Sequence, residues 1–285
     1  MQKIKIAAFL AMGFFCQSAF SQDDLLKDLD TIAPQETTQA TFIGLQICNM
    51  QSTKMPAKKE LYAVISHRFG DLQYGFNNFF GLDEAVTKLG MIYGVTDWLS
   101  LAASRHTYHK LYELTAKYRL AAQEENGFPV TIAGYNTWDI NSELDKEVYP
   151  GLKASHRYAF SSQLLISRKL GERVSLELAP VYVHKNLYEP GQENKDQFVL
   201  AAGGRCKITK RMSLNLEYGA RFNSPETVIY KNPLAVGLDI DTGGHIFQLV
   251  FSNSQAMNDV SYFTNAAGDW NTRSIFFGFN LYRVF

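Results

Sequence analysis

The chain has 285 residues, of which 46% are hydrophobic and 13% aromatic, and its formal net charge at pH 7 is zero. This length suits one large domain or two small ones. The balanced charge gives no basic face, so we do not expect nucleic acid as a partner. The 15 Tyr and 20 Phe residues are typical of β-strands and of the aromatic girdles of membrane barrels.

The start of the chain has the pattern of a cleaved secretory signal. Lys3 and Lys5 form a charged region, residues 6–15 form a short apolar run, and residues 19–21 supply small side chains before a cleavage point. We therefore interpret residues 1–21 as a signal peptide and expect the mature protein to be exported.

The cysteines and the lack of long apolar runs argue against a lipid anchor and against a transmembrane helix. Cys16 follows two Phe residues where lipidation needs a small residue, which argues against a lipid anchor. Cys48 and Cys206 could be bonded to each other after export, or could remain two unpaired thiols. Beyond the signal no run of 18 apolar residues occurs, so a membrane role would require a closed β-barrel.

Residues 22–59 differ in character from the rest of the chain. A polar stretch is followed by a Gln/Thr-rich spacer over 34–41, a candidate strand over Thr41–Cys48, and a Lys- and Pro-containing loop over 51–59. We predict that this region is a periplasmic extension that contributes an extra strand or a plug. Residues 60–285 are then the barrel domain.

Alternation of apolar and polar residues recurs from Glu60 onward. In residues 211–222 the apolar side chains occupy the even positions, and most of the odd positions are polar. Side chains alternate across a strand, so each such segment has one apolar and one polar face. The predicted strands are 60–69, 86–95, 99–106, 111–120, 128–138, 157–168, 174–184, 197–207, 212–222, 234–240, 244–253 and 274–285.

The connections between these strands are of two kinds. Those after even-numbered strands are short, and those after odd-numbered strands are long, apart from 107–110. Outer-membrane barrels combine short periplasmic turns with long external loops, whereas a β-sandwich gives no reason for this asymmetry. The pattern predicts an all-β, antiparallel up-and-down transmembrane barrel of about 12 strands, with 10–14 as the range, and both termini in the periplasm.

One short phrase occurs in three of the short connections. The third position of the phrase is charged in each copy: Asp97, Glu172 and Lys210. The first two lie 75 residues apart and the last two 38 residues apart, which is close to twice and once a single repeat length. A period of about 38 residues fits two strands with their connections, so the phrase predicts one type of tight turn used repeatedly at the periplasmic rim. The copies are VTDWLSL (95–101), LGERVSL (170–176) and ITKRMSL (208–214).

The last segment, SIFFGFNLYRVF, resembles the C-terminal signal that the outer-membrane barrel assembly machinery recognises. Such signals end in Phe and carry apolar residues at every second position before it. Arg283 departs from the pattern, at a small cost near the membrane interface, where its side chain can reach the headgroups. The residues that fit the signal are Phe277, Phe279, Leu281 and Phe285.

Several blocks of the sequence carry a family resemblance. They are SHRFGD (66–71), NNFFGLDEA (77–85), LGMIYGVTD (89–97), DIDTGGHIFQLVFSNS (239–254) and GFNLYRVF (278–285). The chain resembles an uncharacterised β-barrel family of Bacteroidota, a domain of unknown function, from about residue 41 to the end. The resemblance implies an outer-membrane location and carries no activity, substrate or catalytic residue.

The polar faces of the predicted strands place charged residues inside the barrel. Basic groups slightly outnumber acidic ones, which would give an open lumen a weak anion preference. A network of paired charges filling a narrow barrel is the alternative, because twelve strands lie between a packed interior and a water-filled channel. The predicted lumen charges are Lys88, Glu113, Lys117, Arg119, Glu177, Arg205, Glu217, Arg221 and Asp239.

The histidines give weak signals for chemistry. His106 and His109 share a short external loop, with His67 and His156 near the same rim, but a metal site needs several converging ligands, so we expect no metal. His184 lies on the outward face near a rim, where lipid-cleaving barrels carry a catalytic His. No Ser–His–acid spacing accompanies it, so we name no catalytic residue.

These observations lead to one functional hypothesis and one alternative. The first is a non-enzymatic outer-membrane barrel, either a narrow pore or transporter or a structural barrel. The alternative is a barrel enzyme that modifies lipids or lipopolysaccharide. The expected partners are outer-membrane lipid, the barrel assembly machinery and small solutes, and no cofactor is expected.

Overall fold

The computed structural model describes residues 41–124 and 127–285. The signal peptide predicted for residues 1–21 lies outside the described residues. The same is true of residues 22–40, the first part of the predicted extension.

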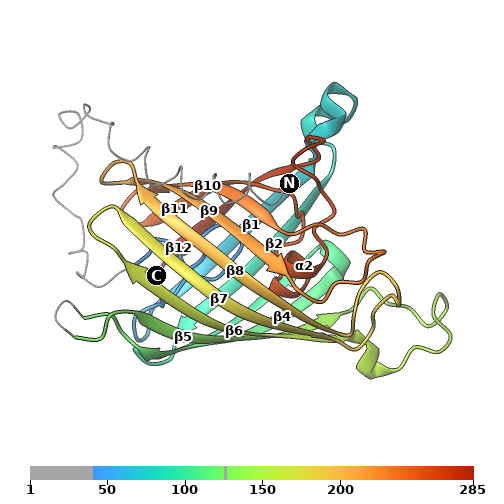
Figure 1. Cartoon of the computed structure of the whole chain (residues 1–285), viewed down its shortest axis with the longest axis horizontal. Coiled ribbons are helices and arrows are strands. Elements are labelled where there is room, and N and C mark those ends of the chain that lie inside the picture. Colours follow the sequence, from blue (N-terminus) through green and yellow to red (C-terminus); the bar gives the residue numbers. More distant parts are fainter. Residues whose placement is uncertain (1–40, 125–126) are drawn as a thin grey trace.

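The described chain forms one closed barrel of twelve antiparallel strands, each paired with its neighbours in sequence, and β1 closes the ring with β12 (Figure 1). The predicted fold class and strand number are confirmed. Every predicted strand is present, and the largest shift is three residues, at both ends of β5. The strands are β1 (Leu61–Asp71), β2 (Ala85–Gly94), β3 (Leu99–His106), β4 (Leu111–Ala121), β5 (Thr131–Asn141), β6 (Tyr158–Lys169), β7 (Val174–Lys185), β8 (Asp196–Lys207), β9 (Met212–Arg221), β10 (Leu234–Asp241), β11 (His245–Ser252) and β12 (Phe276–Val284).

The alternation of residue types gives the strands a mostly apolar outer face. Their inner face is polar, apart from an apolar patch of β5 to β8 that packs against the short helix α2 (Asp259–Thr264). Along β7, Leu176 and Leu178 are exposed, whereas Ser175 and Glu177, which alternate with them, are buried. This arrangement is the reverse of a soluble protein, because the exposed side chains are the apolar ones. It matches a barrel whose outer face meets lipid.

The repeated phrase forms the same backbone turn in three hairpins. The amide of its first residue donates to a carbonyl four residues later in all three copies: Val95 to Leu99, Leu170 to Val174 and Ile208 to Met212, each at 2.9 Å. The three turns lie at the end of the barrel where β1 begins and β12 ends. The prediction of one turn type on one rim is therefore confirmed.

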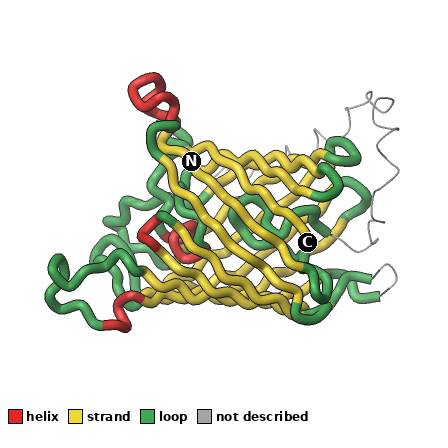
Figure 2. The backbone as a smooth tube through the Cα atoms, turned by 180° about the vertical axis from the view of Figure 1, so that it is seen from behind, coloured by secondary structure: helices red, strands yellow, loops and turns green. Residues whose placement is uncertain are grey.

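The opposite end carries the long connections and the short helices. These are the 3-10 segments η2 (Leu72–Gly81), η3 (Tyr108–Lys110) and η4 (Ala154–Arg157), and the α-helix α2 (Asp259–Thr264). Figure 2 shows η2 projecting beyond the barrel, while α2 lies against the inside of the strand wall. No helix in the described part of the chain is long and apolar enough to cross a membrane.

Two segments fill the barrel interior. Residues 41–56, which we call the lumen plug, are buried except for the half-buried Lys54. Residues 253–268, the inward loop, fold in from the other end and carry α2, whose six residues are all buried. The candidate strand Thr41–Cys48 adds no strand to the barrel and takes part only in an isolated bridge between Gln46 and Gln51.

Candidate functional site: the lumen and its plug

The plug folds back on itself at the middle of its length. The Ile47 amide donates to the Met50 carbonyl at 2.8 Å, and the Ser52 amide donates to the Leu45 carbonyl at 3.0 Å. These two bonds make a tight turn whose remaining amides and carbonyls have no strand partner. Because buried backbone groups need hydrogen bonds, the barrel wall has to supply them.

Glu217 of β9 receives the tip of this turn. Its fully buried carboxylate accepts hydrogen bonds from three consecutive backbone amides, those of Cys48 at 2.9 Å, Asn49 at 2.8 Å and Met50 at 3.0 Å. The Asn49 side chain adds a fourth bond at 3.2 Å. Successive amides that converge on one anion form a backbone nest, and bonds to a charged acceptor are the stronger kind.

Lys117 of β4 holds the two legs of the turn. Its Nζ atom donates to the carbonyls of Leu45 at 3.1 Å, Ser52 at 2.8 Å and Lys54 at 3.3 Å. An ammonium group has three donors, and each is used here on a plug carbonyl. Glu217 and Lys117 therefore bind the two kinds of main-chain group that the plug leaves free.

Amide side chains of the wall bind further plug carbonyls. Asn215 donates to the Ile47 carbonyl at 2.9 Å and Gln248 donates to the same oxygen at 2.5 Å, while Asn280 donates to the Cys48 carbonyl at 2.8 Å. These contacts come from β9, β11 and β12, so several strands hold one short turn. The Cys48 thiol itself is free and buried.

The fit between plug and wall depends on two glycines. A Cβ atom added at Gly203 would lie 2.4 Å from Cδ1 of Ile47, and one added at Gly237 would lie 2.7 Å from Sγ of Cys48. Both distances are shorter than real Cβ contacts, so a side chain at either glycine requires the facing plug side chain or the strand to shift.

Arg68 is a lumen charge that we did not predict. It is 1% exposed, and its Nη2 donates to Asn49 of the plug at 2.8 Å, while Nη1 donates to Asn280 at 3.0 Å. It shares its strand face with Val64 and Ser66, which are also buried, so alternation along β1 would have placed it inside. The alternation along β1 was therefore the sequence feature that could have predicted the inward position of Arg68.

The plug meets the inward loop in the middle of the barrel. Asp259, at the start of α2, accepts from Gln51 of the plug at 3.5 Å and from Gln163 of β6 at 2.7 Å. Met50 packs in one buried apolar cluster with Val260 and Phe263 of the same helix. The two segments that enter from opposite ends thus meet inside the barrel.

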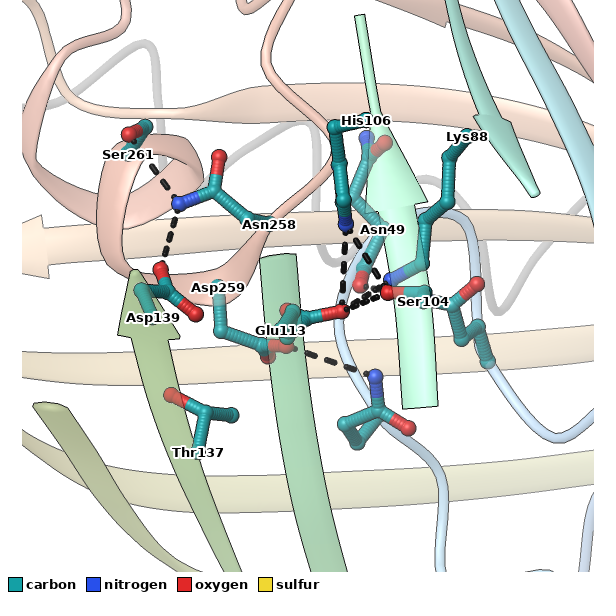
Figure 3. Close-up of polar contacts among 12 residues, drawn as sticks. Asn49, Lys88, Ser104, His106, Glu113, Thr137, Asp139, Asn258, Asp259 and Ser261 are labelled. Carbon is teal, nitrogen blue, oxygen red and sulfur yellow. Dashed lines mark hydrogen bonds and ion pairs between the residues drawn. The ribbon is translucent and has the colours of Figure 1, made fainter. Parts of the chain in front are cut away.

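A second buried cluster lies beside this junction (Figure 3). Lys88 lies 2.6 Å from Glu113 Oε2, and that oxygen also accepts from Ser104 at 2.8 Å and lies 3.3 Å from His106 Nε2. The Ser104 hydroxyl also lies 3.0 Å from His106 Nε2, so Ser104 and Glu113 both approach the same imidazole nitrogen. A Ser–His–acid relay needs the acid on the other nitrogen, so this arrangement is an ion-pair network.

All nine predicted lumen charges lie on inward positions. Seven are buried, and Arg119 and Arg221 are half-buried near strand ends. They are tied into the lumen network: Arg205 donates to Ser213 at 2.8 Å, and Asp239 accepts from Gln248 at 2.6 Å. Further buried charges that were not predicted are Arg68, Asp139, Lys185, Glu193 and Asp259.

The family of the chain follows from a model that covers the whole described barrel. A family model described as "Membrane bound beta barrel domain (DUF5777)" matches residues 42–285. The chain belongs to this family. The resemblance to a barrel family of unknown function is confirmed at this level, and a Bacteroidota origin stays a prediction. Because the match begins at residue 42, the family domain includes the lumen plug as well as the strands.

Solved structures share the fold at low sequence identity. The COG4313 outer membrane channel from Pseudomonas putida F1 has a TM-score of 0.50 and 12% identity, over 81% of this chain and 97% of that chain. The KdgM porin has a TM-score of 0.49 and 10% identity, over 78% and 99% of the two chains. At such identities the likeness concerns the fold alone. A comparison with curated proteins finds no match.

The histidines that the sequence singled out do not converge. His67 contacts Thr87, His106 lies in the Glu113 cluster, His109 contacts Glu143 and His156 contacts Lys153. In the described part of the chain no group of three or more His, Cys, Asp or Glu residues could hold a metal ion.

His184 lies on the outer face, where it contacts Asp196 at 2.7 Å and Asn186 at 3.0 Å. A lipid hydrolase would need a nucleophile beside this imidazole. The Tyr182 hydroxyl lies 3.4 Å from His184 Nδ1, and it donates to the same Asp196 oxygen at 2.6 Å. Within the described residues no serine hydroxyl bonds this imidazole.

Proposed function

We propose that the protein is a non-enzymatic outer-membrane barrel whose pore is closed by its own residues 41–56. The observation that carries the proposal is the lumen plug, held by Glu217 on one side and by Lys117 on the other. The outer-membrane location is supported by membership in a family of membrane-bound barrels and by the apolar outer face of the strands.

The network explains why the closed state would dominate. If the plug left, Glu217 would lose the amides of three residues and Lys117 would lose three carbonyls. Buried charges stripped of their partners are strongly unfavourable until water replaces those partners. Opening therefore requires the plug to withdraw and water to enter the lumen in its place.

The size of the barrel supports a pore beneath the plug. Eight strands leave an interior that side chains can fill, and sixteen leave an aqueous channel. A twelve-stranded barrel lies between these cases, and here a chain segment takes up the remaining space. The solutes of the open state would be small, and the inward basic groups would give a weak anion preference.

Planar-bilayer recordings of a variant that lacks residues 41–56 test this proposal. The unaltered protein should be silent, and the deletion variant should give steady channels, because the deletion removes the plug and leaves all twelve strands intact. A matched control deletes residues 143–150 from an external loop and should remain silent. Compact, heat-modifiable migration on gels would show that all three proteins are folded.

Two results would contradict the proposal. Steady conductance by the unaltered protein would show that the plug does not close the pore. Silence of a correctly folded deletion variant would show that the barrel has no pore to close, which would favour a purely structural role.

A further inference from the structure

The outer face of the barrel carries a groove of about 490 Å³. It crosses β4 to β8, where the compact Pro180 lies on its floor and the Tyr118 ring covers Gly134. A volume of this size suits a small ligand or part of a lipid. The side chains that wall the groove include Tyr118, Leu164, Tyr182, Phe198, Leu200 and Phe222.

The middle of this groove is polar, although the outer face around it is apolar. Tyr118 donates to Oδ1 of Asn136 at 3.1 Å, and Asn136 donates to Oγ of Ser162 at 2.7 Å. The outward neighbours of Ser162 on its strand are Phe160 and Leu164. Hydrocarbon offers no hydrogen-bond partner, so polar groups in a lipid-facing wall are costly unless something else satisfies them.

Two donors of this polar trio remain free. Ser162 accepts from Asn136 and has its own hydroxyl hydrogen left, and Asn136 has a second amide hydrogen left. Neither donates to an acceptor within the described residues. An occupant of the groove should therefore carry an oxygen acceptor along an otherwise apolar body.

Strand register shows where the groove leads. Asn136 pairs with Ser162, Ser162 with Tyr182, and Tyr182 with Phe198, while the Phe222 amide donates to the Phe198 carbonyl at 3.0 Å. Asn136 is the sixth of eleven residues in β5, whereas Phe198 is the third residue of β8. The groove therefore runs obliquely across the outer face, from Asn136 in the middle of the wall to Phe198 near the rim that carries the long loops.

We propose that this groove binds one acyl lipid of the membrane. An acyl chain would occupy the apolar part, and Ser162 and Asn136 would donate to an oxygen on that chain, either an ester or amide carbonyl or a chain hydroxyl. The headgroup would then lie at the rim, where Asp196 bonds both Tyr182 and His184 at 2.6 and 2.7 Å.

A lipid fits this groove better than a second copy of the chain. In a twofold dimer the same patch lies on both partners, so one hollow would face another and neither would be filled. A flexible chain can enter a concave surface. The groove lies outside the wall and the plug lies inside it, so this inference does not depend on the proposed pore.

Native mass spectrometry of protein extracted from membranes in mild detergent tests the inference. The unaltered protein should keep a bound lipid, and the variant N136L/S162A should keep about tenfold less, because two hydrogen bonds are lost. The matched control T87V removes an outward hydroxyl beside His67, outside the groove, and should keep the lipid.

A second variant separates lipid loss from misfolding. Leu164→Trp fills the groove and leaves Asn136 and Ser162 in place, so it should also lose the lipid. A photoactivatable acyl phospholipid should label β5 to β8 in the unaltered protein and label this variant far less. Removing polar groups from a lipid-facing wall should not impair folding, which heat-modifiable migration would verify.

Three results would overturn the inference. The lipid could be absent from the unaltered protein, it could be retained equally by all variants, or it could be lost equally from T87V. A stable dimer that N136L/S162A dissociates would assign the groove to self-association instead. None of these results would bear on the conductance of the plug deletion.

Discussion

The carboxylate of one residue, Glu217, binds the backbone amides at the tip of the plug. Four hydrogen bonds to it come from the plug residues Cys48, Asn49 and Met50. The Glu217 side chain is fully buried, so no water competes for these donors. A change in its charge alone should therefore alter the closed state.

We predict that Glu217→Gln makes the closed pore open intermittently. The substitution keeps the shape of the side chain but removes the charge, and it turns an amide group toward donors of the plug. Loss of bonds to a charged group costs about 2 kcal/mol or more, which is roughly a thirtyfold change in the open population. Bilayer recordings should show bursts of conductance, and the control Glu172→Gln, in an exposed turn, should stay silent.

Asp259 makes the stability of the folded inward loop depend on pH. Burial, together with repulsion from Glu113, raises the pKa of Asp259 to about 7. A raised carboxyl pKa stabilises the folded loop below the ordinary pKa of an Asp, and this contribution is lost as the pH rises through the folded value. The closed loop should therefore loosen progressively between about pH 4 and pH 7, and change little above that.

Melting temperatures at a series of pH values would measure this effect. The unaltered protein should melt at a progressively lower temperature as the pH rises from about 4 to about 7. Asp259→Asn removes the titrating group and should flatten that dependence, whereas Asp145→Asn, in an exposed loop, should leave it unchanged. An unchanged slope in Asp259→Asn would assign the pH dependence to another group.

The shape of strand β8 matches that of the plug. Gly203 of β8 leaves room for the Ile47 side chain, since an added Cβ would lie 2.4 Å from it. We predict that Gly203→Val displaces the plug and opens the pore. Adding Ile47→Ala should restore silence, because the smaller side chain makes room for the valine. Failure of this rescue in bilayer recordings would mean that Gly203→Val acts through the strand itself.

The closing strand, β12, supports a prediction about assembly. The backbone of Phe285 pairs with Leu61 across the seam, with N···O distances of 2.9 and 3.4 Å. Phe277 and Phe279 line the outer face, and Arg283 lies 4.8 Å from the Phe285 ring centre. Deleting Phe285 should therefore impair insertion and leave degraded periplasmic protein in cell fractions. Phe222→Ala, an equally exposed Phe elsewhere, should insert normally.

The strands could be predicted from the sequence because alternation is a local property. Each strand shows its two faces within about ten residues, and the nine lumen charges follow from those faces. The plug could be suspected but not placed, because residues 41–56 lack alternation. Its decisive contacts join residues far apart in the chain, with Cys48 and Glu217 separated by 169 positions. Only the closed barrel brings such pairs together.

At the scale of the whole molecule, the barrel encloses a segment of its own chain. The plug contacts strands from β1 to β12, and the inward loop covers it from the other end. The buried charges of the wall are thereby partnered without a separate soluble domain. In the proposed function, closure depends on contacts between plug and wall, so a covalent bond between them should make it permanent.

We predict that Gly237→Cys locks the plug in place. An added Cβ at Gly237 lies 2.7 Å from the free thiol of Cys48, which is close to the separation that a disulfide requires between these atoms. Combined with Glu217→Gln, the oxidised bond should suppress the bursts of conductance, and a reducing agent should restore them. Cys48→Ser in the same background cannot form the bond, so it should conduct under both conditions. Bursts that persist in the oxidised protein, with the bond verified by mass spectrometry, would show that ions pass without movement of the plug tip.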